Sequence, residues 1–235
     1  MRSTRIFLVL FFACVFFWGG LYSIATRYSI AAKHATMDWV VNATVTIKVV
    51  SESGQEWSGS GAFVSKDGIV MTAAHVLSDA QTVTIVTADG TEYAAKNPYV
   101  SDSADVAFCQ IEADIVVPFL RIATLPTAVG DVVRVVGSPL GLDFHNTVSQ
   151  GIVSFNDRIL DNTRYMQIDA SAIPGNSGGP VVNLQGEIVG VLVAGIQPGV
   201  EINFAVPANQ AEAVFNCYIC HNNLKGLLCP PQPQN

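Results

Sequence analysis

One serine of the chain lies in a glycine-rich segment of the kind that supports nucleophilic chemistry. Ser177 is part of Gly175-Asn-Ser-Gly-Gly-Pro180, a run that forms neither helix nor strand easily. A serine hydroxyl attacks a carbonyl only when a base takes its proton, and the developing oxyanion needs backbone N–H groups aimed at it. Because glycine lets the backbone turn such groups inward, the segment predicts a catalytic nucleophile at Ser177. The alternative is a glycine-rich turn between two strands.

Such a nucleophile needs a histidine as its base, and the chain has four histidines. His34 lies beside an apolar N-terminal segment, His145 lies in a loop, and His221 lies between cysteines. His75 instead ends the segment MTAAH, where a strand runs into small residues and an imidazole can be held firmly while it still faces a cleft. A lone histidine at such a place is more often structural, but together with Ser177 it is the predicted general base.

An acid must hold that histidine in the correct tautomer. Asp105, in the segment SADVAF, begins an apolar strand and can project toward a cleft. We therefore expect Asp105 to be the acid, with Asp102 as the second candidate. Without His75 and Ser177, Asp105 would be an ordinary turn residue at a strand edge.

The order of the three residues separates two fold classes. The segment around Ser177 also fits the nucleophile elbow of the α/β-hydrolases, whose order is serine, acid, histidine. After Ser177 the only histidine is His221, and Gly178-Gly179-Pro180 is a poor start for a helix. The order His75, Asp105, Ser177 therefore excludes the elbow.

The elements that must position these residues are short and rich in β-branched side chains. Residues 39–50 predict the first strand, and the turn Lys66-Asp67-Gly68 joins two apolar segments as a hairpin. Further strands are expected at residues 82–87, 92–95, 106–111, 119–122, 132–136, 147–154, 165–168, 188–193 and 202–206. Many short strands with frequent turns indicate an all-β sandwich or barrel, and only Ala208–Tyr218 predicts a helix. With 235 residues, 50% of them hydrophobic, the chain can form one large domain or two halves of a double barrel.

The charge of the chain argues against nucleic acid as a partner. The formal net charge is −7, and two of the basic residues, Arg2 and Arg5, belong to the N-terminal apolar segment. The remainder carries ten basic and nineteen acidic side chains and has no Lys/Arg cluster. Nucleic-acid binding usually needs a basic face, so we expect none here.

An uncharged apolar run, Ile6–Ala25, precedes the folded part. It is long enough to span a bilayer, and we expect an uncleaved anchor that attaches the chain to the membrane. The alternative is a cleaved signal peptide, because Ser23-Ile-Ala25 offers small residues of the type that signal peptidase reads. Both alternatives send the rest of the chain out of the cytoplasm, into the periplasm or cell envelope if the source is bacterial. The expected organisation is an anchor or signal peptide at 1–26, a linker at 27–38, a folded domain at 39–215 and a cysteine-containing tail at 216–235.

Several long segments of the chain resemble one protein family. The segments are GSGAFVSKDGIVMTAAHV, SADVAFCQIE, VGSPLGL, TVSQGIVS, QIDASAIPGNSGGPVVNLQGEIVGV and INFAVP. Together they are similar to the protease domain of the HtrA (Deg) serine proteases, which belong to the trypsin-like double β-barrel class. The resemblance covers residues 39–215 and implies a trypsin-like serine protease domain there. It implies that unfolded or damaged polypeptides are the substrates and that no cofactor is needed.

The resemblance also assigns roles to residues. It implies that His75 is the general base, that Asp105 orients it and that Ser177 attacks the scissile carbonyl. The backbone N–H groups of Gly175 and Ser177 would form the oxyanion hole. Asn176 stands where zymogen-type relatives have an aspartate that binds a new N-terminus, so activation by cleavage is not expected.

Two further expectations follow from comparison with the family's fuller members. Fewer than thirty residues follow Pro207, whereas a PDZ domain needs about 80 to 100, so no PDZ domain is expected. Relatives often trimerise, which makes a homo-oligomer the expected assembly type, although no residue here establishes a trimer.

Ser171 lies six residues before Ser177, at the position that forms the floor of the primary pocket in trypsin-like folds. No acid stands there, so cleavage after Lys or Arg is not expected. Val191, Leu192 and Val193 would supply an apolar wall. The expected P1 residue, on the N-terminal side of the cleaved bond, is therefore small or medium-sized and apolar.

The C-terminal tail contains a separate group of candidate ligands. Cys217, Cys220 and His221 match the C-x-x-C-H pattern of haem attachment, and Cys229 follows. The same four residues could form a small zinc site, or the cysteines could form a disulfide or remain thiols. Disulfide or thiol chemistry is the expectation, and no metal or haem is predicted.

Two other classes of function compete with the protease hypothesis. A non-catalytic binding or scaffold protein could retain a protease fold, and a complete triad argues against it. A redox or haem protein built on the cysteine tail would leave His75, Asp105 and Ser177 unexplained.

Overall fold

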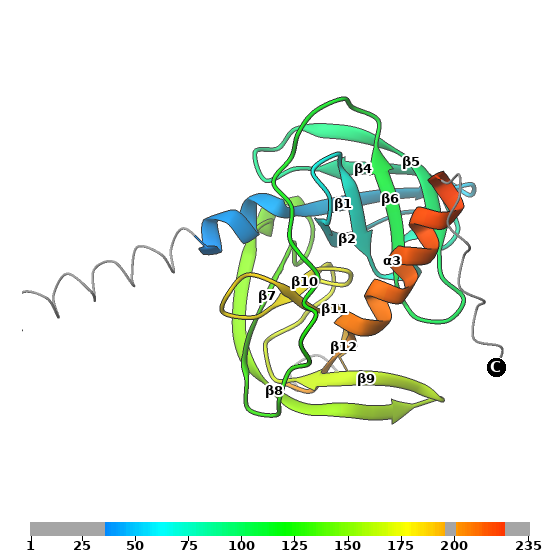
Figure 1. The fold of residues 1–235 in the computed structure, drawn as a ribbon. Coiled ribbons are helices and arrows are strands. Elements are labelled where there is room, and N and C mark those ends of the chain that lie inside the picture. The colour runs from blue at the N-terminus through cyan, green and yellow to red at the C-terminus, as the bar shows by residue number, and fades with distance from the viewer. Residues whose placement is uncertain (1–35, 196–200, 224–235) are drawn as a thin grey trace, which may run out of the picture. The chain divides into compact units, whose positions relative to one another are not determined.

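Two closed, six-stranded antiparallel barrels follow one another along the chain in a computed structural model (Figure 1). The structure describes residues 36–195 and 201–223. By its contacts the chain divides into a unit of residues 1–38 and a unit of residues 39–235, and the second unit contains both barrels. The double barrel predicted from the sequence is confirmed.

The predicted N-terminal anchor or signal peptide lies outside the described residues. In the stretches 36–195 and 201–223, no helix combines the length and the apolar character needed to cross a bilayer.

The first barrel closes in the strand order β1-β2-β3-β6-β5-β4. Its β-branched strands alternate buried and partly exposed side chains, as in the second half of β1. The predicted hairpin turn forms at Gly68, whose φ is +82° and whose N–H donates to the carbonyl of Ser65 over 3.3 Å. The strands are β1 (Thr44–Ser51), β2 (Glu56–Phe63), β3 (Ile69–Thr72), β4 (Ala80–Val86), β5 (Glu92–Val100) and β6 (Ala107–Ile111).

The second barrel closes in the order β10-β11-β12-β9-β8-β7. Its core contains five valines, Ile168, Met166 and Leu192, all at most 3% exposed. Burial of such side chains is the main source of the barrel's stability. The strands are β7 (Val132–Gly137), β8 (Thr147–Leu160), β9 (Thr163–Ile168), β10 (Pro180–Val182), β11 (Ile188–Gly195) and β12 (Asn203–Pro207).

A C-terminal helix, α3 (Ala208–Asn223), contacts both barrels (Figure 1). It begins where the sequence predicts and continues five residues beyond the predicted end at Tyr218. The rings of Phe215 and Tyr218 lie 5.3 and 5.5 Å from the ring of Phe108 in β6. Since α3 follows β12 directly, these aromatic contacts attach the end of the second barrel to the first.

Two predicted strands differ from the structure. Residues 39–43 are helical, not extended, and β1 begins only at Thr44, whose hydroxyl donates to the carbonyl of Val40 over 2.9 Å. Residues 119–122 form a single bridge between Ile122 and Ile188 instead of a strand. In both places tertiary contacts outweigh β-propensity. One such contact joins the two segments, because Trp39 Nε1 donates to the carbonyl of Phe119 over 3.0 Å.

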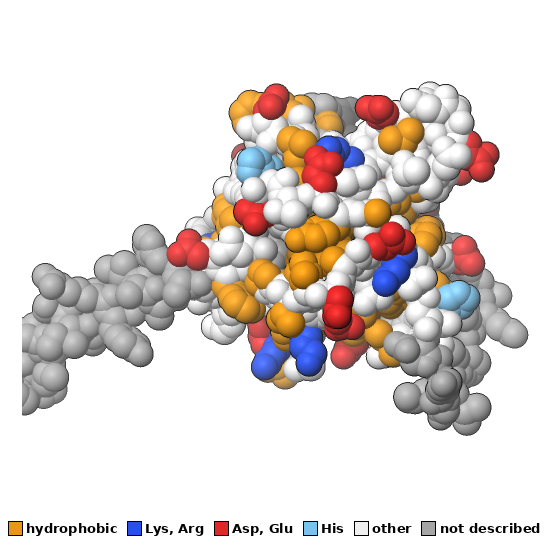
Figure 2. All heavy atoms as spheres, turned by 90° about the horizontal axis from the view of Figure 1, so that it is seen from above, with side chains coloured by type: hydrophobic (Ala, Val, Ile, Leu, Met, Phe, Trp, Pro, Cys, Tyr) orange, Lys and Arg blue, Asp and Glu red, His pale blue; other side chains and the backbone are white. Residues whose placement is uncertain are grey.

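The surface carries dispersed charges. In the space-filling view, acidic and basic side chains are scattered among uncharged and apolar ones (Figure 2). Two exposed ion pairs lie on this surface. Lys48 in β1 binds Glu92 in β5 at 2.6 Å, across the intervening strand β4, and Arg164 in β9 binds Asp157 in the neighbouring strand β8 at 2.8 Å. Exposed pairs of this kind add little stability, so the fold depends on its two cores.

Candidate active site

The glycine-rich segment around Ser177 lies where the two barrels meet. The N–H of Ser60, in β2 of the first barrel, donates to the carbonyl of Ser177 over 2.7 Å, and the N–H of Gly178 donates to the carbonyl of Leu192 in β11 over 2.7 Å. A Cβ on Gly178, whose φ is +84°, would collide with the side chain of Thr72 and the carbonyl of Ser60. Only glycine therefore lets this segment lie against the first barrel.

His75 and Asp105 are brought together on the first barrel. His75 lies in a one-turn helix, α2 (Ala74–Leu77), immediately after β3, and Asp105 lies just before β6. Its Nδ1 lies 2.8 Å from Asp105 Oδ2, and its backbone N–H donates to Oδ1 over 2.9 Å. One carboxylate therefore fixes both the backbone and the ring of His75. With the proton on Nδ1, Nε2 is left as the basic nitrogen.

The pKa of Asp105 reflects two opposing effects. Burial raises it, but the hydrogen bond and the charge of His75, together with the backbone N–H groups of His75 and Ala74, lower it by more. The net pKa lies below the ordinary value of 3.8. Asp105 is therefore ionised at neutral pH and can stabilise positive charge on the imidazole.

The hydroxyl of Ser177 has a partner other than His75. Among the described residues, Ser177 Oγ donates to the carbonyl of Val193 in β11 over 3.1 Å, and no hydrogen bond joins it to His75. The sequence did not predict this orientation. A rotation about χ1 of Ser177 would be needed before its proton could pass to an imidazole.

The peptide groups before Gly175 and Ser177 are both held by their carbonyls. The carbonyl preceding Gly175 accepts the N–H of Leu140 over 2.9 Å, and the carbonyl preceding Ser177 accepts the N–H of Gly179 over 2.9 Å. In a trans peptide the carbonyl and the N–H point in opposite directions. The N–H groups of Gly175 and Ser177 therefore point away from these partners, and neither donates to an acceptor within the described part of the chain.

Gly175 has no room for a side chain. Its φ is +98°, and a Cβ would lie 2.5 Å from the carbonyl oxygen of Ser138 and 2.8 Å from the nitrogen of Leu140. The neighbouring Asn176 is 6% exposed, and its Oδ1 has no hydrogen-bond partner in the described structure. The segment thus adopts a conformation that needs glycine at Gly175 and buries a neutral amide at the next position.

The four residues predicted to form the specificity pocket differ in burial: Ser171 is exposed, whereas the other three are buried. Ser171 is exposed, and its carbonyl accepts the hydroxyl of Ser149 over 2.8 Å. Val191 and Val193 are 0% and 5% exposed, and Leu192, at 1%, packs in the core of the second barrel. The structure therefore brings the backbone of Val193 to Ser177, while Leu192 directs its side chain into the core.

The predicted ligands of the C-terminal tail lie on or beyond α3. Cys217 and Cys220 are one turn apart on the helix, and the ring of His221 lies 5.6 Å from that of Tyr99. Cys229 lies outside the described residues. Within the described ranges, no group of three His, Cys, Asp or Glu side chains could hold a metal ion.

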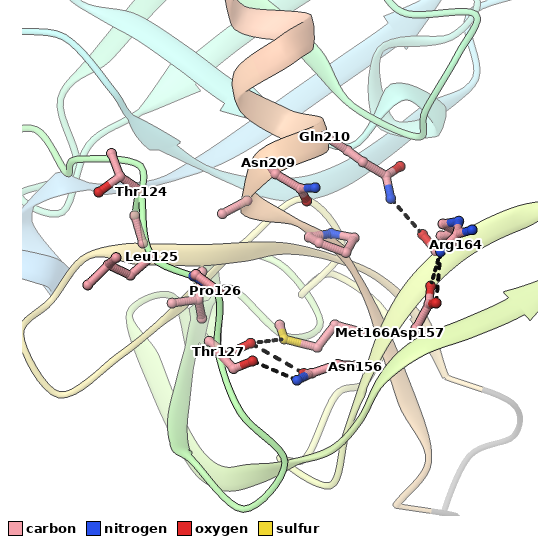
Figure 3. Close-up of a pocket in the computed structure, with 14 residues that line it drawn as sticks. Thr124, Leu125, Pro126, Thr127, Asn156, Asp157, Arg164, Met166, Asn209 and Gln210 are labelled. Atoms are coloured by element: carbon pink, nitrogen blue, oxygen red, sulfur yellow. Dashed lines mark hydrogen bonds and ion pairs between the residues drawn. The ribbon is translucent and has the colours of Figure 1, made fainter.

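A separate pocket of about 440 Å³ lies in the second barrel, beside the first turn of α3 (Figure 3). Its polar groups bind one another: Asn156 Nδ2 donates to the carbonyl of Thr127 over 2.6 Å, and Arg164 binds both carboxylate oxygens of Asp157 at 2.8 Å. None of the residues proposed for catalysis lines it. This pocket is therefore distinct from the residues that the sequence predicts to be catalytic.

Two closed barrels with a serine segment at their junction define the trypsin-like class of fold. Residues 59–191 match the family described as the trypsin-like peptidase domain. The chain belongs to this family.

Curated relatives refine this assignment. The chain is 39% identical over 161 residues to serine protease HTRA1B of Danio rerio, which covers 65% of the chain and 33% of that protein. It is 38% identical over 168 residues to a probable periplasmic serine endoprotease, DegP-like, of Rhizobium meliloti, with 68% and 33% covered. The chain thus spans about a third of the length of these relatives. The resemblance to HtrA (Deg) proteases predicted from the sequence is confirmed.

A solved structure agrees with the fold. The serine endoprotease of Yersinia pestis matches with a TM-score of 0.71 and 29% identity, over 80% of this chain and 66% of that one. An HtrA-type protease solved with a tripeptide matches with a TM-score of 0.73 at 24% identity, which supports the fold alone.

Proposed function

We propose that the chain is a serine endopeptidase that hydrolyses peptide bonds through His75, Asp105 and Ser177. The observation that carries the proposal is the double contact of Asp105 with His75 on the first barrel, to which the Ser177 segment is hydrogen-bonded through Ser60. Membership of the trypsin-like peptidase family supports the same chemistry.

In the proposed reaction, His75 Nε2 takes the proton of Ser177 as its Oγ attacks the scissile carbonyl carbon. The N–H groups of Gly175 and Ser177 stabilise the oxyanion that forms. The imidazolium then gives its proton to the leaving amine, and the C–N bond breaks to leave an acyl-enzyme. Water, deprotonated by His75, attacks the ester carbonyl and releases the acid and the free Ser177 hydroxyl. Asp105 remains ionised throughout.

The orientation of Ser177 sets a condition for this reaction. Its hydroxyl donates to the carbonyl of Val193. In the proposed complex, a main-chain N–H of the bound peptide donates to this carbonyl instead. A peptide that takes this acceptor would release the hydroxyl for His75. Hydrogen bonds of a catalytic site are often incomplete before substrate binds, which agrees with this condition.

The proposed substrates are unfolded or damaged polypeptides outside the cytoplasm. The support is the similarity to a relative named as a probable periplasmic serine endoprotease. The resemblance to HtrA proteases noted in the sequence implies unfolded polypeptides as the substrate class. We expect cleavage after small or medium apolar residues, because Ser171 supplies no negative charge at the predicted pocket floor. Membrane attachment through residues 6–25 and assembly into a homo-oligomer belong to the same proposal.

The test is turnover of unfolded casein by the purified full-length chain, with Ser177→Ala as the matched control. Wild type should cleave casein, and the variant should lose about 10⁵ to 10⁶ in kcat. Equal turnover by the two proteins would rule out Ser177 as the nucleophile. A peptide library cleaved mainly after Lys or Arg would overturn the apolar P1 preference without affecting the triad.

A second candidate function is a silent protease fold that binds polypeptides without cleaving them. The observation that favours it is the hydrogen bond of Ser177 to Val193 in place of one to His75. Polypeptide binding by wild type, with no turnover of casein or of peptides with apolar P1 residues, would select this alternative.

A further inference from the structure

Ser60 joins the first barrel to the peptide segment that carries Gly175 and Ser177. It lies in β2, is 0% exposed, and its Oγ donates to the carbonyl of Gly175 over 2.7 Å. The same oxygen accepts the N–H of Ser138 over 2.9 Å, and the backbone N–H of Ser60 donates to the carbonyl of Ser177. One residue therefore holds two carbonyls of the glycine-rich segment.

These contacts complete a fixed series of peptide groups. The carbonyls before Gly175 and before Ser177 are held by Leu140 and Gly179, and the carbonyls of Gly175 and Ser177 themselves are held by Ser60. Four consecutive peptide planes are thus fixed, and only the two contacts from Ser60 come from the first barrel. The orientation of the N–H groups of Gly175 and Ser177 depends on this frame.

The surroundings of Ser60 leave little space for another arrangement. A Cβ on Gly137 would lie 2.9 Å from Ser60 Oγ and 2.8 Å from Asn176 Oδ1. Thr72 Oγ1 donates to the carbonyl of Ser60 over 2.7 Å and fixes its backbone from the other side. The hydroxyl of Ser60 therefore links Gly175 and Ser138 directly, through hydrogen bonds of 2.7 and 2.9 Å.

We infer that Ser60 is a positioning residue, whose hydroxyl holds the Gly175–Ser177 segment in the conformation that presents both N–H groups to the oxyanion. The inference rests on the proposed protease function. Ser60 does not touch the reacting atoms. The carbonyls that it holds belong to the planes Gly175–Asn176 and Ser177–Gly178, which are adjacent to the two planes that carry the N–H groups of Gly175 and Ser177, and it acts on those N–H groups through these neighbouring planes. Its loss should therefore weaken stabilisation of the transition state more than binding of the substrate.

The test compares Ser60→Ala with Thr46→Val in the full-length chain, using a peptide substrate with an apolar P1 residue. Thr46 shares a hydrogen bond with Ser138 at the same junction and touches no carbonyl of the glycine-rich segment, so its variant loses a comparable buried hydrogen bond. Ser60→Ala should lower kcat about 10- to 100-fold, which is less than the roughly 10²- to 10³-fold loss caused by removing an oxyanion-hole donor. Its KM should stay within about threefold of the wild-type value. Thr46→Val should keep kcat within about threefold of wild type.

A second readout separates positioning from general destabilisation. A peptide trifluoromethyl ketone adds to the nucleophile and places an oxyanion in the hole, so its Ki should rise for Ser60→Ala by about the same factor as kcat falls. The Ki of a non-covalent peptide inhibitor should not change. A fall in kcat without a rise in the ketone Ki would overturn the inference.

The remaining outcomes are also decisive. If folded Ser60→Ala keeps kcat within about threefold of wild type, Ser60 has no positioning role. If near-UV circular dichroism shows that Ser60→Ala does not fold, Ser60→Cys replaces it, since cysteine is of similar size and a weaker donor. Reduced kcat with unchanged KM then supports the inference, and wild-type kcat overturns it. A wild-type chain without turnover removes the proposed function itself, and this inference with it.

Discussion

The carboxylate of Asp105 binds His75 at two points, Nδ1 at 2.8 Å and the backbone N–H at 2.9 Å. Asp102, the second acid considered from the sequence, is instead exposed on the loop before β6. The two aspartates are three residues apart and of the same chemical type. They therefore form a natural pair for separating an orienting acid from a surface acid.

Asp105→Asn should lower kcat about 10³- to 10⁴-fold, because asparagine can hold His75 in the wrong tautomer while preserving its shape. Asp102→Asn should leave kcat within about threefold of wild type. Steady-state hydrolysis of one peptide by the two variants measures both effects. Equal losses in the two variants would show that Asp105 is not the orienting acid.

The lowered pKa of Asp105 predicts how stability depends on pH. Because the pKa in the folded chain lies below 3.8, ionised Asp105 stabilises the fold above that pH, and this contribution is lost as pH falls through the folded pKa. The stability difference between wild type and Asp105→Asn should therefore be constant from about pH 7 to pH 5 and change below about pH 4. Urea unfolding at a series of pH values measures it. A difference that stays constant down to about pH 2 would contradict the assigned shift.

Gly175 and Gly130 test whether the shape of the serine segment matters for chemistry. Both have a left-handed backbone, with φ of +98° and +92°, but a Cβ would collide with neighbours only at Gly175. Replacing either glycine by alanine should lower the free energy of unfolding by roughly 1 kcal/mol, because the backbone at both positions is strained for a residue with a side chain. Only Gly175→Ala should also displace the segment and lower kcat by about 10²-fold. Unchanged kcat in Gly175→Ala would remove this peptide from the proposed oxyanion hole.

Cys109 offers a test of the first barrel core. It is 0% exposed, and burial raises the pKa of its thiol to about 12. Since thiolate is the reactive form, iodoacetamide at about pH 8 should modify Cys109 at least 100-fold more slowly in the native chain than in urea. Mass spectrometry of the peptide that contains Cys109 gives the two rates. Similar rates would mean that this core opens readily in the native protein.

The parts of the fold that the sequence predicts are those with a strong local signal. Most of the short strand segments, the turn at Gly68 and the start of α3 at Ala208 appear where they are expected, whereas residues 119–122 form only a single bridge. Residues 39–43 were wrongly predicted as strand, because the contacts that favour helix there depend on residues such as Phe119, eighty positions away.

The candidate site likewise has features that the sequence predicts and features that only the folded structure shows. The order His75, Asp105, Ser177 is a property of the sequence, and it indicates both the fold class and the chemistry. The role of Ser60 depends on a contact with Gly175 across 115 residues, and only its place between Gly59 and Gly61 hints that the backbone is close to something. The orientation of the Ser177 hydroxyl is a side-chain rotation that no residue pattern encodes.

Treatment of the purified chain with a fluorophosphonate, followed by mass spectrometry to locate the adduct, tests whether Ser177 is an activated nucleophile. Activated serine nucleophiles react with this reagent, whereas ordinary serines do not. A single phosphonyl group on Ser177, absent from Ser177→Ala and strongly reduced in Asp105→Asn, is the predicted result. No adduct on Ser177 in native protein that binds peptide, or an adduct on another serine, would show that Ser177 is not the activated nucleophile.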